Sequence, residues 1–275
     1  MTTPRSILVH VDSSRHAVER VRTARRIAEA FDAQGTGMHC AVSAILRYPH
    51  GLDALSAEAI DAFADIDRRC HAQARAAFVE GRAGSERLLW EEASGNEPFD
   101  FARRACYADL LIVGQRDDAD ASADELPPTF LPSLLVGSGR PALVLPFIGA
   151  QANLGRRILI GWKETREAAR AVSAALPWLR GAARVDAVCH GPGAADALAR
   201  LAQYLRAHGV TPALRASDAP DASDMGERLL TLAADVEADL LVMGCYGHSR
   251  AREWLLGGAT RTVLETMTLP VLMSH

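Results

Sequence analysis

A glycine-rich stretch near the C-terminus carries the clearest chemistry in the chain. An apolar run at 238–243 ends in Gly244, Gly247 follows, and Gly257 and Gly258 come just before a helical pattern. Backbone N–H groups in such a loop and at the helix start can bind an anion, because the helix dipole favours negative charge there. The other candidate anion contacts in this stretch are His248, Arg250, Ala259 and Thr260. A purely structural role in a tight loop and in helix packing explains the same glycines.

The segments around this loop occur twice in the chain. Three pairs of segments match in the same order: 5–14 with 157–165, 108–114 with 238–244, and 140–146 with 269–273. Such a repeat indicates an internal duplication, and a length of 275 residues suits two domains. We therefore predict domains at 1–148 and 156–275, joined by a linker near 147–155.

Both halves alternate short apolar runs with amphipathic segments. The predicted strands are 7–11, 38–45, 88–90, 109–114 and 142–145, then 158–162, 184–188, 211–214, 240–244 and 271–273. The predicted helices are 18–31, 52–79, 98–105, 166–179, 194–208, 223–236 and 258–266, and the acidic segment 115–128 is expected to be a loop. Strands alternating with helices predict a parallel sheet with helices on both faces in each domain.

The glycine spacing resembles that of the universal stress protein (UspA-like) family. Nucleotide-binding members carry Gly-x2-Gly-x9-Gly-(Ser/Thr) after the fourth strand, and Gly244, Gly247 and Gly257 stand at those glycine positions. The first-strand signature is similar too, at 7–14. The resemblance covers essentially the whole chain as a tandem. It implies two Rossmann-like (adenine nucleotide alpha hydrolase-like) α/β domains, each a five-stranded parallel sheet flanked by helices.

The resemblance also implies a ligand. ATP or another adenine nucleotide, with Mg²⁺ only alongside ATP, would be a regulatory ligand of the second domain in a stress response. The further site residues it implies there are Gly161, Trp162, Lys163 and Val188. In nucleotide-binding members an acid after the first strand contacts the adenosine, and Lys163 occupies that position here. Gly258 lacks the family's hydroxyl, although Thr260 is close enough to replace it.

The first domain keeps the acid but not the glycine loop. Val11, Asp12 and Ser13 are its candidate nucleotide contacts, yet Gly114 has no second glycine three residues on. The acids of the following loop, which would repel a triphosphate, are Asp118, Asp120, Asp124 and Glu125. Nucleotide binding is therefore expected in the second domain rather than in the first.

The remaining reactive side chains point to no further site. No nucleophile elbow, Walker A or Gly-x-Gly-x-x-Gly motif occurs, so no catalytic residue is assigned and ATP hydrolysis is the least favoured function. His39-Cys40 and Cys70-His71 could meet as a zinc site, but buried thiols explain them and no metal site is assigned. Cys245 lies in the glycine loop and, if exposed, is the thiol to test for redox sensing.

Composition and charge restrict the partners. A net charge of −4, no basic block and no apolar run of roughly 18 residues favour neither nucleic acid nor a membrane. Five widely spaced cysteines without Cys-x-x-Cys favour a cytoplasmic protein with reduced thiols. The resemblance implies pairing of the last strands, 141–147 with 269–275, in an internal pseudo-dimer. A homodimer and an unidentified protein partner stay open, as does a nucleotide-free interaction module.

Overall fold

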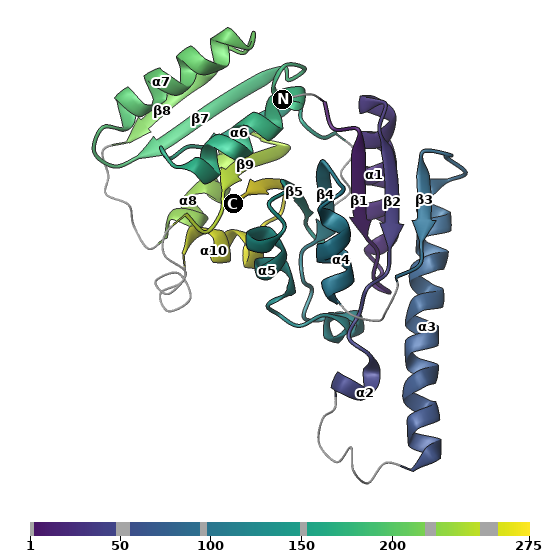
Figure 1. The fold of residues 1–275 in the computed structure, drawn as a ribbon. Coiled ribbons are helices and arrows are strands. Elements are labelled where there is room, and N and C mark those ends of the chain that lie inside the picture. The colour runs from purple at the N-terminus through teal and green to yellow at the C-terminus, as the bar shows by residue number, and fades with distance from the viewer. Residues whose placement is uncertain (1–2, 48–55, 94–97, 149–152, 218–223, 248–257) are drawn as a thin grey trace. The chain divides into compact units, whose positions relative to one another are not determined.

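The structure is a computed structural model that describes residues 3–47, 56–93, 98–148, 153–217, 224–247 and 258–275. The chain divides into two compact units, Pro4–Arg140 and a unit formed mainly by Pro141–His275. The colours of Figure 1 follow the chain through them from purple to yellow.

The unit 4–140 is built around four parallel strands. Its strands are β1 (Ser6–His10), β2 (Gln34–Met38), β3 (Leu88–Glu91) and β4 (Leu110–Gly114), in the order β3-β2-β1-β4. Its helices are α1 (Ala17–Phe31), α2 (Ala44–Arg47), α3 (Ala57–Arg82), α4 (Pro98–Ala105), the 3₁₀ helix η2 (Ala121–Glu125) and α5 (Phe130–Gly137). Parallel strands joined by helices are the arrangement that the alternating pattern predicts.

The unit 141–275 contains the five parallel strands that were predicted for the second domain. They are β6 (Arg157–Gly161), β7 (Arg184–His190), β8 (Ala213–Ser217), β9 (Leu240–Gly244) and β10 (Val271–Ser274), in the order β10-β9-β6-β7-β8. The helices are α6 (Arg166–Leu179), α7 (Ala194–Ala207), α8 (Met225–Asp235) and α10 (Ala259–Thr266). The α/β fold class with a mostly parallel sheet is confirmed.

The strand β5 (Ala142–Leu145) departs from the parallel arrangement. It pairs antiparallel with β10, with Val144 opposite Val271 and Ala142 opposite Met273. The expected pairing of the two repeat-terminal strands is therefore present. Because of this pairing, β5 belongs to the compact unit 141–275, although the sequence repeat places it at the end of the first copy.

The predicted strand at 38–45 is wrong. The second strand is β2, Gln34–Met38, and α2 begins at Ala44. The apolar run drew the prediction too far along the chain, because β2 is rich in glycine. A Cβ on Gly35 would lie 2.3 Å from Leu88 Cδ2, and one on Gly37 would lie 2.4 Å from a ring carbon of Phe78. Close packing, not β propensity, therefore selects this strand.

The segment 115–128 is also more ordered than the predicted loop. It contains η2, whose N-cap Asp120 accepts a hydrogen bond from the backbone N–H of Ser122. Helix α5 follows, which the sequence patterns did not indicate. Its sequence, FLPSLLVG, is apolar almost throughout. It therefore lacks the separate polar and apolar faces on which helix prediction depends. Both elements pack over the C-terminal end of β1, as described below.

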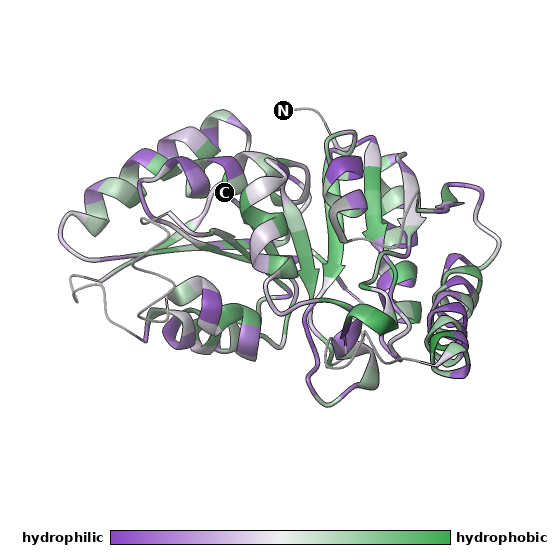
Figure 2. Ribbon diagram, turned by 60° about the horizontal axis from the view of Figure 1, so that its bottom comes forward, coloured by the Kyte–Doolittle hydropathy of each residue, from purple (hydrophilic) through white to green (hydrophobic). Residues whose placement is uncertain are grey.

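Buried apolar side chains form the interior of both units. Figure 2 shows the strands mostly green and the helices striped with purple, as expected for helices with one face on a sheet. In α1, for example, the fully buried residues Val21, Ala24 and Ala28 recur at three- and four-residue spacing. Within the described residues, no helix combines the length and the apolarity that a membrane crossing requires.

Candidate functional site

Three of the predicted site segments meet at the carboxyl edge of the sheet in the unit 141–275. In the strand register Gly161, the last residue of β6, lies opposite Val188 of β7 on one side and Met243 of β9 on the other. The backbone N–H of Trp162 donates to the carbonyl of Val188 at 2.8 Å. Ligands of open parallel sheets bind at this edge, so the predicted residues of three strands lie where a site is expected.

Gly244 is explained by packing. A Cβ at this position would lie 2.5 Å from the backbone nitrogen of Ala168 and 2.8 Å from the carbonyl carbon of Glu167. Both neighbours belong to the first turn of α6, which passes directly over the end of β9. The structural reading of this glycine is therefore sufficient on its own, because no side chain fits between β9 and α6.

Gly247 is different. It is exposed, it is not among the residues with positive φ, and the nearest atom to an added Cβ would be Glu167 Oε2 at 3.1 Å. That atom belongs to a side chain, which can move by the few tenths of an ångström that a Cβ needs. Neither backbone conformation nor packing within the described residues demands glycine here.

The start of α10 offers backbone donors to an anion. Its N-cap is Gly258, in an extended conformation and without a side-chain capping hydrogen bond, and Ala259 is its first residue. Thr260 is buried, and its hydroxyl oxygen accepts a hydrogen bond from the backbone N–H of Tyr246 at 3.3 Å. The hydroxyl proton of Thr260 is not used in that contact. The expected replacement for the missing family hydroxyl is therefore hydrogen-bonded to the glycine loop.

A buried acid beside the loop was not expected from the sequence. Glu167 lies in the first turn of α6, is only 3% exposed and is paired with Arg166. Burial raises the pKa of Glu167, but the hydrogen bonds from Arg166, Thr165 and the backbone, with the charge of Arg166, together leave that pKa below its usual value. An acid in the first helical turn is common, because it complements the helix dipole. The sequence position of Glu167 therefore did not indicate that this side chain is buried beside the loop.

The remaining predicted residues of this unit have mixed outcomes. Lys163 is exposed in the loop after β6, and its carbonyl accepts from the backbone N–H of Thr165. Cys245 is buried, with 1% exposure, which corrects the idea of an exposed redox thiol. Three predicted contacts, His248, Arg250 and Gly257, lie outside the described residues.

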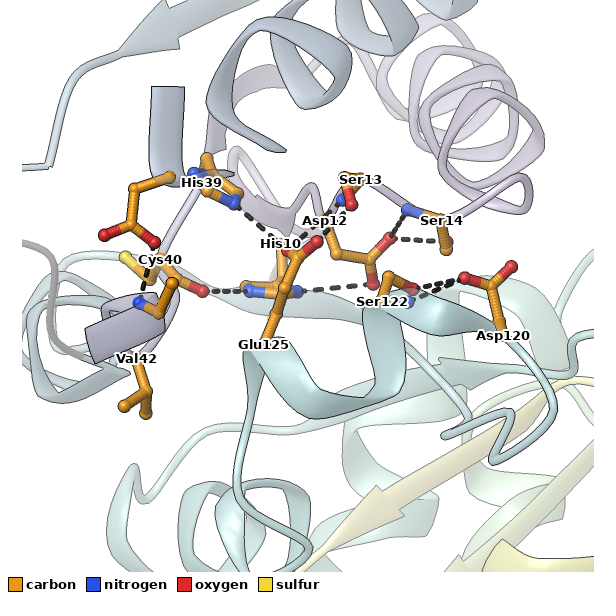
Figure 3. Close-up of polar contacts among 12 residues, drawn as sticks. His10, Asp12, Ser13, Ser14, His39, Cys40, Val42, Asp120, Ser122 and Glu125 are labelled. Carbon is orange, nitrogen blue, oxygen red and sulfur yellow. Dashed lines mark hydrogen bonds and ion pairs between the residues drawn. The ribbon is translucent and has the colours of Figure 1, made fainter. Parts of the chain in front are cut away.

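In the unit 4–140 the side chain of Asp12 is already occupied. Its Oδ2 accepts from Arg20 Nη1 at 2.8 Å. Its Oδ1 accepts from the backbone N–H of Ser14 at 3.1 Å (Figure 3). Burial raises the pKa of Asp12, but the Arg20 guanidinium, with smaller contributions from His10 and the Ser14 hydrogen bond, holds that pKa well below its usual range. Arg20 passes so close to Gly114 that a Cβ there would lie 2.1 Å from Nη2. Asp12 therefore serves an internal ion pair.

Ser13 is occupied by the chain's own acidic segment. Glu125, at the end of η2 and 1% exposed, accepts hydrogen bonds from the hydroxyl and the backbone N–H of Ser13, and its Oε2 lies 3.2 Å from His39 Nε2 (Figure 3). The backbone N–H of Val42 donates to the Glu125 carbonyl at 2.7 Å. Burial raises the pKa of Glu125, but the hydrogen bonds from His39 and Ser13 outweigh burial and lower it. The segment 115–128 thus folds back onto the residues where a nucleotide was considered.

His10 completes this buried network. Its Nε2 lies 3.0 Å from the carbonyl oxygen of Cys40, to which it donates, and its Nδ1 lies 3.9 Å from Asp12 Oδ2. The ring packs against Phe101 and Phe130, each with its centroid 5.3 Å away. Burial lowers the pKa of His10 to about 4, despite the nearby charge of Asp12. His10 is therefore neutral at pH 7.

The space left in this unit is small. A cavity of about 60 Å³ is lined by His10, Asp12, Ser14, Arg20 and Gln115, among others. This is room for a few water molecules, whereas sites for drug-sized ligands measure roughly 300–1,000 Å³. Within the described residues, an adenine nucleotide does not fit in this cavity as it stands.

The two Cys/His pairs lie near each other without forming a metal site. The rings of His39 and His71 are 5.7 Å apart between centroids, but these pairs form no group of three ligand atoms within 4.8 Å among the described residues. Burial raises the pKa of Cys40 to about 12, and burial together with Glu125 raises the pKa of Cys70. Both thiols are therefore protonated at neutral pH; Cys40 is buried and Cys70 is partly buried.

Comparison with known proteins finds a matching family over part of the chain and solved structures with a similar fold. Residues 195–275 match the universal stress protein family. A universal stress protein from Archaeoglobus fulgidus DSM 4304 superposes with a TM-score of 0.72 at 13% identity, covering 98% of this chain and 96% of that one. The predicted resemblance to the universal stress protein family is confirmed.

Two further solved structures extend the comparison. A putative universal stress protein from Pseudomonas aeruginosa UCBPP-PA14 has a TM-score of 0.59 at 16% identity and covers 98% of this chain and 92% of that one. A universal stress protein from Archaeoglobus fulgidus in complex with dAMP covers 52% of this chain and 98% of that one, at 16% identity and a TM-score of 0.32. That score is too low for its ligand to be carried over. No curated protein sequence matches the chain.

The match to universal stress proteins falls on the half that keeps the glycine loop. It covers α7 through β10, and thus Gly244, Gly247 and the start of α10. The residues that sequence reasoning missed are Arg20 and Glu167, which lie within helices whose sequence pattern does not reveal their contacts. His39 was considered only as a zinc ligand, whereas it contacts Glu125. Glu125 was noted only as a repulsive charge, and nothing in its sequence position indicated that it reaches Ser13.

Proposed function

We propose that the unit 141–275 binds ATP or a related adenine nucleotide as a regulatory ligand of a universal stress protein. The phosphates would lie against the loop after β9 and the start of α10. The nucleoside would lie toward Gly161, Trp162 and Val188, at the ends of β6 and β7. The unit 4–140 would bind no nucleotide, since Arg20 and Glu125 occupy Asp12 and Ser13.

Gly247 is the observation that carries this proposal. Gly244 is needed by the packing of α6, so its presence says little about a ligand. Gly247 is exposed, has no positive φ and meets only a movable carboxylate, so the described residues give no internal reason for glycine. Close approach of a ligand to the backbone is a physical reason for a residue without Cβ at such a position.

The charges around the site favour weak binding. The dipole and backbone N–H groups at the start of α10 attract phosphate, and the exposed Lys163 adds a positive charge at the same edge of the sheet. Glu167, 3% exposed and next to Gly247, opposes an anion. One hydrogen bond to a charged group contributes about 1.5–3 kcal/mol, so each lost family contact costs roughly a factor of ten to a hundred in affinity.

Calorimetric titration with ATP tests the proposal. The test variant is Gly247→Asp, which installs the residue found at the matching position of the first repeat, Asp117. The matched control is Gly181→Asp, because Gly181 is exposed, lies before β7 at the opposite edge, and would give an added Cβ only an ordinary contact at 3.7 Å. We expect wild type and Gly181→Asp to bind ATP and Gly247→Asp to lose binding. Equal binding by all three proteins would place ATP elsewhere.

A nucleotide-free interaction module is the second candidate, and Glu167 is the observation that favours it. A buried carboxylate next to Gly247 is unfavourable for a triphosphate. No detectable heat from the wild type at millimolar ATP would favour this candidate over nucleotide binding. Release of inorganic phosphate above background would instead point to ATP hydrolysis.

A further inference from the structure

Three metal-ligating side chains converge at the carboxyl edge of the sheet in the unit 4–140. His16 is the N-cap of α1, and Asp117 and Asp120 lie in the segment after β4. One ligand atom from each lies within 4.8 Å of the others. Strands β1 and β4 are parallel neighbours, so the two loops that carry these residues leave the sheet side by side.

Each carboxylate presents one oxygen to the cluster, because the other is held by its own loop. Asp117 Oδ1 accepts from the backbone N–H of Ala119 at 3.1 Å. Asp120 Oδ1 accepts from the backbone N–H and the hydroxyl of Ser122, at 2.9 and 2.8 Å. The Oδ2 atoms of both residues face Arg15. Fixing one oxygen in this way orients the other, as outer contacts do around bound metals.

A guanidinium stands where a cation would bind. Arg15 Nη2 lies 3.0 Å from Asp117 Oδ2, and Arg15 Nε lies 3.7 Å from Asp120 Oδ2. The side chain of Arg15 is 69% exposed, whereas that of Asp117 is 8% exposed. The carboxylate is thus built into the fold, and the cation that faces it is on the surface. Because the Arg15 guanidinium is in contact with solvent, water screens its attraction to the carboxylates, and another cation can replace it there.

Arg15 satisfies this cluster incompletely. His16 Nε2 lies 3.1 Å from Arg15 Nε, which is a donor, and also 3.1 Å from Asp117 Oδ2, which is an acceptor. One ring nitrogen carries either a proton or a lone pair, so it satisfies only one of these neighbours. A metal ion resolves the conflict, because it takes the nitrogen lone pair and the carboxylate oxygen together.

We propose that His16 Nε2, Asp117 Oδ2 and Asp120 Oδ2 bind one divalent first-row transition-metal ion in place of the Arg15 guanidinium. One imidazole and two carboxylates suit Mn²⁺, Fe²⁺, Co²⁺ or Zn²⁺ better than Ca²⁺ or Mg²⁺, which favour oxygen alone. Three protein ligands leave further positions for water. The proposal stands independently of nucleotide binding, which concerns the unit 141–275.

Such an ion would hold the occluding segment in place. His16 belongs to the loop after β1, and Asp117 and Asp120 to the segment that carries Glu125 onto Ser13. A metal ion bridging the two loops would therefore favour the arrangement in which Glu125 contacts Ser13. A metal ion that binds only the folded state also raises the unfolding free energy, which then increases with the logarithm of the free metal concentration.

Titration of the full chain with Mn²⁺, without nucleotide, tests the proposal. Binding is measured as the loss of the free Mn²⁺ signal in electron paramagnetic resonance. Mn²⁺ avoids the five cysteines, since thiolates select softer metals. The variants are Asp120→Asn, which removes a ligand charge, and Arg15→Ala, which removes the competing cation. The matched control is Asp118→Asn, because Asp118 is in the same segment, is 81% exposed and pairs with Arg116 instead.

We expect one Mn²⁺ per chain, at least about tenfold weaker binding in Asp120→Asn, and tighter binding in Arg15→Ala, with Asp118→Asn unchanged. No binding by wild type and by Arg15→Ala at millimolar Mn²⁺ would overturn the proposal. An equal loss in Asp118→Asn and Asp120→Asn would overturn it too, by indicating a diffuse charge effect. If Asp120→Asn fails to fold, the exposed Arg15→Ala still decides, since unchanged affinity in that variant contradicts displacement of Arg15.

Discussion

Replacing His10 by Gln should remove much of the chain's loss of stability in mild acid. His10 is buried, and its pKa is lowered to about 4 from 6.5 by burial. Between these values the unfolded chain binds a proton that the folded chain does not. The unfolding free energy therefore falls as pH falls through this window. From about pH 7.5 to about pH 5, this group alone removes about 2 kcal/mol from the wild type.

The variant His10→Gln isolates this contribution. The Gln amide nitrogen can still donate to the Cys40 carbonyl, which His10 Nε2 contacts at 3.0 Å, but the side chain does not titrate. Urea denaturation followed by circular dichroism gives the unfolding free energy of both proteins at the two pH values. All other groups titrate in both proteins, so their effects cancel in the difference. The wild type should lose about 2 kcal/mol more than the variant. Equal losses would refute a neutral, buried His10.

Three other substitutions test the packing and the ion pairs. Glu125→Ala should lower the unfolding free energy, measured by urea denaturation, by about 3 kcal/mol, because it leaves Ser13 and His39 without their buried partner. A loss under about 1 kcal/mol would contradict the occupation of Ser13 by Glu125. Gly244→Ala should cost about 2 kcal/mol and lower the thermal midpoint, because its Cβ meets the α6 backbone at 2.5 Å; an unchanged midpoint would argue against that packing. Asp186→Ala should cost about 2 kcal/mol at neutral pH, since the buried carboxylate binds two arginines. Because its folded pKa is lowered, that cost should shrink as pH falls below about 4, and a cost that persists there would contradict an electrostatic origin.

The apolar strands were predictable because their burial leaves a continuous hydrophobic signal. β4 and β9, Leu110–Gly114 and Leu240–Gly244, match the predicted strands to within one residue. β2 was not predictable in this way. Its Gly35 and Gly37 are selected by Leu88 and Phe78, which come from elements much later in the chain. A pattern read along the sequence does not contain those contacts.

The candidate site shows the same division. The repeat and the glycine spacing were enough to bring Gly161, Val188 and Gly244 to one edge of the sheet, because parallel strands place their carboxyl ends together. The outcome for Glu125 could not be foreseen. Its negative charge indicated repulsion of a phosphate, whereas its actual position depends on the fold of η2 and on His39. The sequence thus indicated which residues lie together at this edge of the sheet, but not that Glu125 contacts Ser13 in the first copy.

Amide hydrogen exchange with and without ATP tests most directly that the second copy, and not the first, is the nucleotide site. We predict slower exchange on ATP addition in peptides covering 244–260, with no change in peptides covering 115–128. Protection of 115–128, or no protection in either segment at millimolar ATP, would contradict the assignment of nucleotide binding to the unit 141–275.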